Sequence, residues 1–160
     1  SNNSGPNGSG GGGRISVKLT SGLSFGSVAM QAYGGVGVET LGTGAAGTIY
    51  RQSAAQGAGR GLLLVDNDNQ DAAAYTDIRP QAQCVTGEVN YATLVVANRG
   101  RARLSSETHV GNVFVLTNSS LTLANFDLFV VSARQDLGVG ATPTSVGRII
   151  LRESTLIMIY

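Results

Sequence analysis

The chain has few or none of several residue types that particular functions require. Tryptophan is absent, aromatic residues make up 6% and charged residues 13% of the 160 residues, and the net charge is +1. Proteins that bind nucleic acid normally carry a basic stripe, so this charge balance predicts no nucleic-acid partner. No run of about 18 apolar residues occurs, which predicts that no segment spans a membrane.

Cysteine and histidine are equally scarce, since Cys84 and His109 are the only residues of their types. One cysteine cannot form an internal disulfide or a zinc site, so we expect Cys84 to be an idle thiol or, as the alternative, a bridge to another chain. Glu107 shares a strand face with His109, but no serine or cysteine nucleophile in a recognisable motif accompanies them. We therefore expect His109 to be a surface or turn residue and the protein not to be an enzyme.

Glycine is abundant but unevenly distributed, with 16 of the 23 glycines before residue 60. Residues 1–13 are almost entirely Gly, Ser and Asn, which cannot bury apolar surface, so we expect a flexible segment there. Residues 14–160 have the length of a single domain. Because the apolar stretch 156–160 would form an uncapped strand, we expect a segment of a longer protein, or ends that pair with another chain.

Short apolar runs separated by turn residues predict an all-β domain. Alternation and β-branched residues indicate strands at 14–19, 28–33, 48–50 and 61–67, and strands dominate from residue 89 onward. Residues 68–90 are polar and irregular, with one possible helical turn at 72–75, and residues 132–146 are expected to form a loop. No window predicts a long amphipathic helix.

Three strand–turn–strand units recur in the second half of the chain, at 93–104, 113–123 and 148–158. Their turn residues are Asn98, Asn118 and Glu153, and the second interval is longer than the first. The first interval matches the length of about 20 residues that is typical of one turn of a solenoid.

The alignment of these units predicts which side chains share an interior. Leu94, Phe114 and Ile149 are predicted to stack as one column. A second apolar row is expected after the turns, comprising Ala102 and Leu104, Leu121 and Leu123, and Leu156 and Met158. We predict a parallel β-helix, and an antiparallel β-sandwich is the alternative because it also uses many short strands.

Four glycine-rich phrases support the solenoid interpretation: 10–15, 32–35, 44–50 and 61–67. In this order and spacing they resemble the glycine-rich, right-handed parallel β-helix segments of large secreted surface and adhesin-like proteins. The resemblance covers residues 8–67, and the chain departs from it at Arg51–Ser53 and in the polar insert at 68–90. It implies an extracellular or cell-surface scaffold without catalytic residues.

One glycine motif suggests a different class of protein. Gly42, Gly44 and Gly47 fit the dinucleotide fingerprint GxGxxG. In a nucleotide-binding fold such glycines admit a pyrophosphate, and an acid about 20 residues further on, here Asp66, binds a ribose. The flanking residues predict neither a good strand before the motif nor a helix after it, so a dinucleotide-binding domain is the second alternative. Gly8, Gly10 and Gly13 fit the same pattern within the low-complexity N-terminus.

Two further motifs predict ligands on turns. Asp66, Asp68 and Asp71 are candidate calcium ligands because carboxylates at close spacing in a loop suit a hard cation; a solvated turn is the alternative. Asn118 heads an Asn-x-Ser sequon, as do Asn2 and Asn7. If the protein is a secreted glycoprotein, Asn118 would lie on an outward turn that accepts a glycan.

Together these features predict a non-catalytic structural or adhesive segment of a large extracellular surface or filament protein. Such a segment would be a stiff rod that associates end to end with copies of itself or joins neighbouring domains of the same chain. The first alternative is a carbohydrate-binding or polysaccharide-cleaving β-helix, with glycans as partners. That alternative calls for a row of exposed aromatic or acidic residues, and no such row is evident in the sequence. No cofactor is expected apart from the possible calcium.

Overall fold

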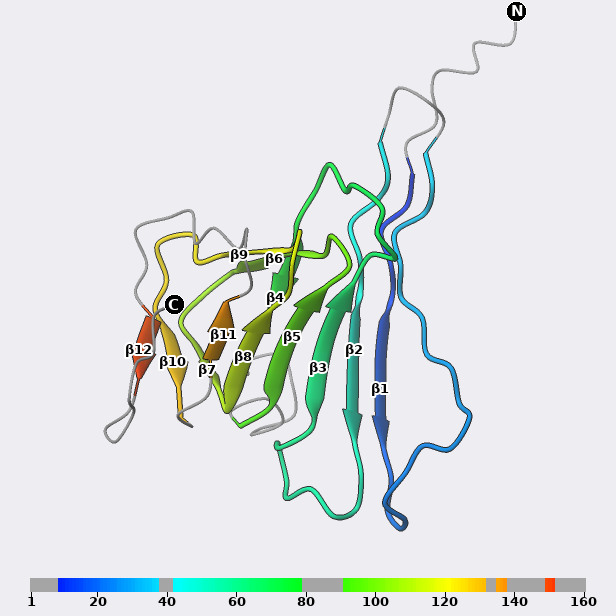
Figure 1. Ribbon diagram of the computed structural model, residues 1–160, viewed down its shortest axis with the longest axis vertical. Coiled ribbons are helices and arrows are strands. Elements are labelled where there is room, and N and C mark those ends of the chain that lie inside the picture. The colour runs from blue at the N-terminus through cyan, green and yellow to red at the C-terminus, as the bar shows by residue number, and fades with distance from the viewer. Residues whose placement is uncertain (1–8, 38–41, 79–90, 132–134, 138–148, 152–160) are drawn as a thin grey trace, which may run out of the picture.

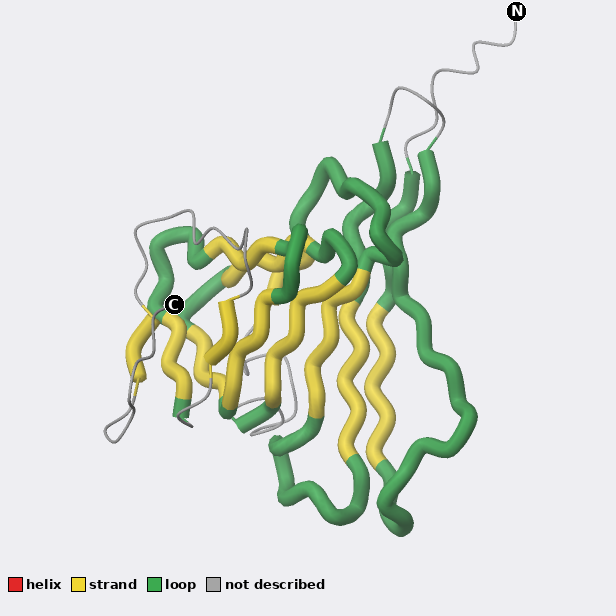
Figure 2. Tube along the Cα trace, viewed as in Figure 1, coloured by secondary structure: helices red, strands yellow, loops and turns green. Residues whose placement is uncertain are grey.

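The computed structural model describes residues 9–37, 42–78, 91–131, 135–137 and 149–151, and within them it contains strands and loops but no helix (Figures 1 and 2). The prediction of an all-β protein is therefore confirmed. The strands are β1 (Arg14–Lys18), β2 (Thr48–Gln52), β3 (Leu62–Asp66), β4 (Thr76–Ile78), β5 (Thr93–Ala97), β6 (Arg101–Leu104), β7 (Thr108–Val110), β8 (Asn112–Val115), β9 (Ser120–Thr122), β10 (Leu128–Val130), β11 (Gln135–Leu137) and β12 (Ile149–Leu151).

These strands form three sheets. The long sheet has the order β1-β2-β3-β5-β8-β11, the β6 sheet has the order β4-β6-β9, and the β10 sheet has the order β12-β10-β7. From β5 to β10 the chain visits the long sheet, the β6 sheet and the β10 sheet in turn, and then repeats this rotation (Figure 1). We call strands β3 to β12 the three-sheet region.

Strand pairing in the described residues is parallel with one exception, the antiparallel pair β2–β3. In the long sheet Leu63, Leu94 and Val113 are successive partners. Val65, Val96 and Val115 form a second column beside them. Each pass therefore places apolar side chains directly over those of the pass before it.

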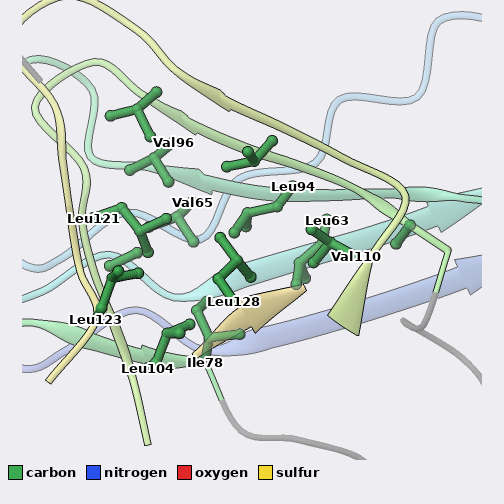
Figure 3. Packing of buried hydrophobic residues seen from close by; sticks show 14 of the residues in the cluster. Leu63, Val65, Ile78, Leu94, Val96, Leu104, Val110, Leu121, Leu123 and Leu128 are labelled. Atoms are coloured by element: carbon green, nitrogen blue, oxygen red, sulfur yellow. The ribbon is translucent and has the colours of Figure 1, made fainter. Parts of the chain in front are cut away.

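One apolar core fills the space between the three sheets. Figure 3 shows Leu63, Leu94 and Val96 of the long sheet pointing toward Leu104 and Leu121 near the β6 sheet. Leu94 and Val96 are 0% exposed. Fully burying such a side chain contributes roughly 1.5–3 kcal/mol, so each residue of these columns stabilises the fold substantially.

The prediction that Leu94, Phe114 and Ile149 form one interior column is wrong. Leu94 pairs with Val113, whereas Phe114 pairs with Val95 and is half-buried on the opposite face of the long sheet. Partner residues of β5 and β8, such as Leu94 and Val113, are separated in the sequence by one residue fewer than Asn98 and Asn118. A register shift of one residue turns every side chain of a strand to the other face of the sheet. Ile149 lies in the β10 sheet beside Leu128.

The predicted second row is confirmed for its first two units. Ala102 pairs with Leu121, and Ala102, Leu104, Leu121 and Leu123 are all buried. The third unit, Leu156 and Met158, lies outside the described residues.

Two predicted local elements are also wrong. Residues 28–33 form a loop, not a strand. Residues 72–75 form no helical turn: Ala72 makes an isolated parallel bridge with Thr43, and β4 follows directly after Tyr75. Strand β11 lies in the stretch that was expected to be a loop.

The N-terminal part of the molecule contains a bundle of three glycine-rich segments that run together above β1 and β2 (Figure 1). We call residues 9–13, 32–37 and 42–47 the glycine bundle. The backbone N–H of Gly12 donates to the carbonyl of Ala45 at 2.8 Å, that of Gly35 to Gly10 at 2.8 Å, and that of Gly44 to Gly35 at 2.9 Å. Each segment is therefore hydrogen-bonded to both of the others.

Glycine is required in this bundle because the backbones approach so closely. A Cβ atom added to Gly47 would lie 1.7 Å from the carbonyl oxygen of Gly13, and one added to Gly34 would lie 1.9 Å from that of Gly44. Such contacts recur three residues apart, at Gly34 and Gly37 and at Gly44 and Gly47. The same steric rule places glycine at every third residue where three collagen chains meet.

Candidate functional site

Two carboxylates of the predicted calcium loop, those of Asp66 and Asp71, contact protein donors. The carboxylate of Asp66 accepts hydrogen bonds from the backbone N–H of Asp68 at 2.8 Å and from the side-chain amide of Asn98 at 2.9 Å. Asp71 forms a salt bridge with Arg99. The described residues contain no group of three His, Cys, Asp or Glu side chains placed to hold a metal ion. The calcium site at Asp66, Asp68 and Asp71 stays a prediction, which a calcium titration of the protein tests.

These contacts join the turn after β3 to the turn after β5. Asp68 and Asn69 have left-handed φ angles of 52° and 57°, and Asn98 and Arg99 have values of 50° and 60°. The backbone N–H of Asn69 donates to the carbonyl of Asn98 at 3.0 Å. The acidic loop therefore stacks on the next turn of the chain, and the carboxylates of Asp66 and Asp71 bind that turn.

Asn118 occupies a third turn of this kind, with φ of 61°, and its side chain is exposed. This position is the outward turn that was expected. Glycosylation at Asn118 stays a prediction.

An arginine–tyrosine cluster, not predicted from the sequence, covers the outer face of the β6 sheet. The guanidinium of Arg101 lies 4.3 Å from the ring centroid of Tyr75, and that of Arg103 lies 5.6 Å from it. Arg103 also forms a salt bridge with Asp77 at 2.7 Å, and Arg101 donates to the carbonyl of Ala72 at 2.7 Å. Exposed cation–π contacts of this kind contribute about 0.5–1 kcal/mol each. The cluster fastens residues 71–77 to β6.

His109 is an exposed residue of the β10 sheet, as expected. Its ring stacks on that of Phe129, with centroids 4.6 Å apart and an interplanar angle of 10°. The two residues are register partners in β7 and β10. Glu107, which precedes β7, is also exposed. The contact that the structure gives His109 is therefore an aromatic stack between neighbouring strands.

The glycines of the dinucleotide motif belong to the glycine bundle. Gly44 and Gly47 pack against the backbone of Gly10 and Gly13, and strand β2 begins at Thr48 directly after the motif. A pyrophosphate site needs a helix that opens at the third glycine and open space above the backbone. In this chain strand β2 follows the motif where a helix would be needed, and the backbone of residues 10–13 occupies the space that a pyrophosphate would need.

A buried asparagine connects the glycine bundle to the three-sheet region. Asn67 is 0% exposed; its side-chain oxygen accepts the N–H of Gly34 at 3.0 Å, and its amide donates to the carbonyl of Gln70 at 2.7 Å. The pKa of the Tyr33 phenol is raised above its ordinary value, mainly by burial and to a smaller extent by the negative charges of Asp66 and Asp68.

An open cavity of about 360 Å³ lies between the loop that follows β1 and the end of β2. Its apolar lining comes from Leu23, Phe25 and Leu62, and its polar lining includes Arg51 and Ser24. Its volume lies within the range of roughly 300–1,000 Å³ that is usual for small-ligand pockets. In the sequence, Arg51 stands out only because the chain departs there from the glycine-rich β-helix segments that it resembles.

No helix in the described residues is long and apolar enough to cross a membrane. None of the protein-family models, curated proteins or solved structures compared with the chain matches it.

Proposed function

We propose that the three-sheet region is a parallel β-solenoid and that the chain is a non-catalytic structural or adhesive segment of an extracellular surface or filament protein. The observation that carries this proposal is the rotation of the chain through three sheets, with parallel pairing in each sheet. An antiparallel sandwich would be built mainly from antiparallel pairs, and β2–β3 is the only such pair described.

A stiff rod suits this arrangement. Each pass of the chain adds backbone hydrogen bonds on three sides and one layer of apolar side chains, and strands in a sheet lie about 4.8 Å apart. In such an array each pass contacts only its neighbours, so passes can be added without altering those already present. The extracellular location belongs to the same proposal and is supported by the glycine-rich phrases of the sequence.

The edge of β1 offers a place where a second copy could add. β1 is the terminal strand of the long sheet and pairs only with β2 among the described strands. The N–H of Leu19 donates to the carbonyl of Gln52 at 2.9 Å, so alternation along the strand directs the N–H of Ser16 away from β2. An exposed edge of this kind can template pairing with another chain. Head-to-tail contacts that do not close generate filaments.

Sedimentation velocity and negative-stain electron microscopy over a range of concentrations test this proposal. We expect rods that lengthen with concentration. Ser16→Pro removes an edge N–H without disturbing the pairing with β2, and it should shorten the rods, whereas Ser16→Thr keeps the N–H and should not. Compact particles of uniform size at every concentration, or rods that Ser16→Pro leaves unchanged, would contradict assembly through this edge.

A further inference from the structure

We propose that the cavity beside β2 binds one acidic sugar unit of a glycan, and that Arg51 pairs with the carboxylate of that sugar. The cavity lies on the outward face of the long sheet, where Arg51 and Leu62 are register partners in β2 and β3. The loop that follows β1 forms the facing wall with Leu23 and Phe25. This proposal does not depend on the scaffold proposal, because the cavity belongs to a single copy of the chain.

Arg51 is distinguished from the other described arginines by its lack of a partner. Within the described part of the chain, no hydrogen bond, ion pair or ring contact engages its exposed guanidinium. Every other described arginine has a partner: Arg14 donates to the carbonyl of Asp77, Arg60 lies over Tyr91, Arg99 pairs with Asp71, Arg101 contacts Tyr75, and Arg103 pairs with Asp77.

A free guanidinium in a cavity selects an anion. Among the described residues, Arg51 is the only charged one that lines the cavity, so the site favours a ligand with a single negative charge. A guanidinium binds a carboxylate through two parallel hydrogen bonds, which fixes the orientation of the ligand as well as its charge. A nucleic-acid strand would instead require several cations in a row along its phosphates.

The remaining walls match a sugar ring. Phe25 and Leu62 offer apolar surface to the C–H face of the ring, and Leu23, which is 78% exposed, adds a third apolar side chain to the lining. The hydroxyl of Ser24 accepts the N–H of Gly26 at 3.0 Å, which leaves its own hydrogen for a sugar hydroxyl. A peptide carboxylate is more often captured by a nest of backbone N–H groups than by side chains. The openness of the cavity lets a longer glycan continue beyond the bound unit.

Titrations of the whole chain, followed by NMR chemical shifts or calorimetry, test the proposal with glucuronate, glucose and acetate as probes. We expect glucuronate to bind with a Kd in the roughly millimolar range, because one small sugar buries little surface. Glucose lacks the charge and acetate lacks the ring, so each should bind at least about tenfold more weakly. Equal binding of acetate and glucuronate, or no binding of glucuronate, would overturn the proposal.

Variants identify the residues that act. Arg51→Gln should weaken glucuronate binding by about tenfold or more, which corresponds to the loss of one charged hydrogen-bonding partner. Arg103→Gln removes the same charge from a different sheet and is the matched control. The affinity of this variant for glucuronate should equal that of the parent protein. Phe25→Ala should also weaken binding, while circular dichroism verifies that each variant keeps its fold. Unchanged affinity in Arg51→Gln, or tighter binding of a tripeptide with a free C-terminal carboxylate, would overturn the assignment.

Discussion

In the three-sheet region the closest contacts are between side chains, whereas in the glycine bundle they are between backbones. Leu94 and Val113 are completely buried against their neighbours in the core. In the bundle, by contrast, Gly12, Gly34 and Gly47 leave no room for even one carbon atom beyond the backbone. The bundle must therefore offset the large conformational entropy that glycine loses on folding through hydrogen bonds between its three segments.

This difference predicts opposite sensitivities in the two regions. Removing atoms should damage the three-sheet region, because it opens a cavity in a packed core. Adding atoms should damage the glycine bundle, because it forces close backbones apart. The side chain of Asn67 hydrogen-bonds to both regions, so a substitution that removes its polar atoms should lower the stability of the protein.

The largest effect is expected from Leu94→Ala in the core. Leu94 is 0% exposed, so truncation should lower the free energy of unfolding by about 2–5 kcal/mol. Urea denaturation measures this loss. Leu64→Ala is the control, because Leu64 lies half-buried on the outward face of the same sheet and should lose clearly less. Equal losses in the two variants would mean that the described register does not hold in solution.

Gly47→Ala should destabilise the bundle by about 1–3 kcal/mol, since the new methyl group would overlap the carbonyl of Gly13. Hydrogen exchange of the Gly12, Gly35 and Gly44 amides reports the opening of the bundle directly. The matched control is Gly10→Ala, where an added Cβ meets no atom within 4 Å and protection should be kept. If both variants retain full protection, the three segments are not packed as described.

Asn67→Ala should lower the free energy of unfolding by about 1–2 kcal/mol, because it removes one buried and one partly buried hydrogen bond and leaves the N–H of Gly34 without its partner. Asn67→Asp keeps the acceptor for Gly34 but replaces the donor to Gln70 with a buried carboxylate, so it should destabilise the protein at least as much as Asn67→Ala. Exchange protection should fall at Gly34 in the alanine variant. A change confined to the three-sheet region would show that Asn67 does not link the two regions.

The smallest effect concerns alkaline pH. The pKa of Tyr33 is raised in the folded state, so the folded protein holds this proton at pH values where the unfolded chain has begun to lose it. Stability should therefore fall as the pH rises above about 10. Tyr33→Phe has no such proton and should lose less stability than the parent between about pH 9 and 11. An identical loss in the variant and the parent would remove Tyr33 from the explanation.

Much of the fold could be predicted because short apolar and β-branched runs mark strands locally. The strands at 48–52, 62–66 and 93–97 were found in this way, as was the buried row of Ala102 and Leu121. The register of β8 could not be predicted, because residues 113–116 are Val, Phe, Val and Leu and so both faces of the strand are apolar. Asn98 and Asn118 both adopt left-handed turn conformations, but the true register is offset by one residue from this pair.

The candidate site was less accessible to sequence reasoning. Residues 23–26 lie beside Arg51 and Leu62 through the tertiary fold, and no local sequence pattern indicates that contact. Likewise Tyr75 and Arg101 are far apart in the sequence, so their contact depends on the pairing of β4 with β6. The one local signal in the sequence is Arg51, a charged residue at a position where the chain departs from the glycine-rich β-helix segments that it resembles.

The same number of residues separates Val96 from Val115 in the long sheet and Ala102 from Leu121 in the β6 sheet. Thr93 and Asn112 occupy equivalent places in consecutive passes. A tandem duplication of residues 93–111 would therefore insert a complete pass while every later strand found the same neighbour as before. A single genetic event of that kind would lengthen the protein by one strand spacing, about 4.8 Å, and leave both of its ends unaltered.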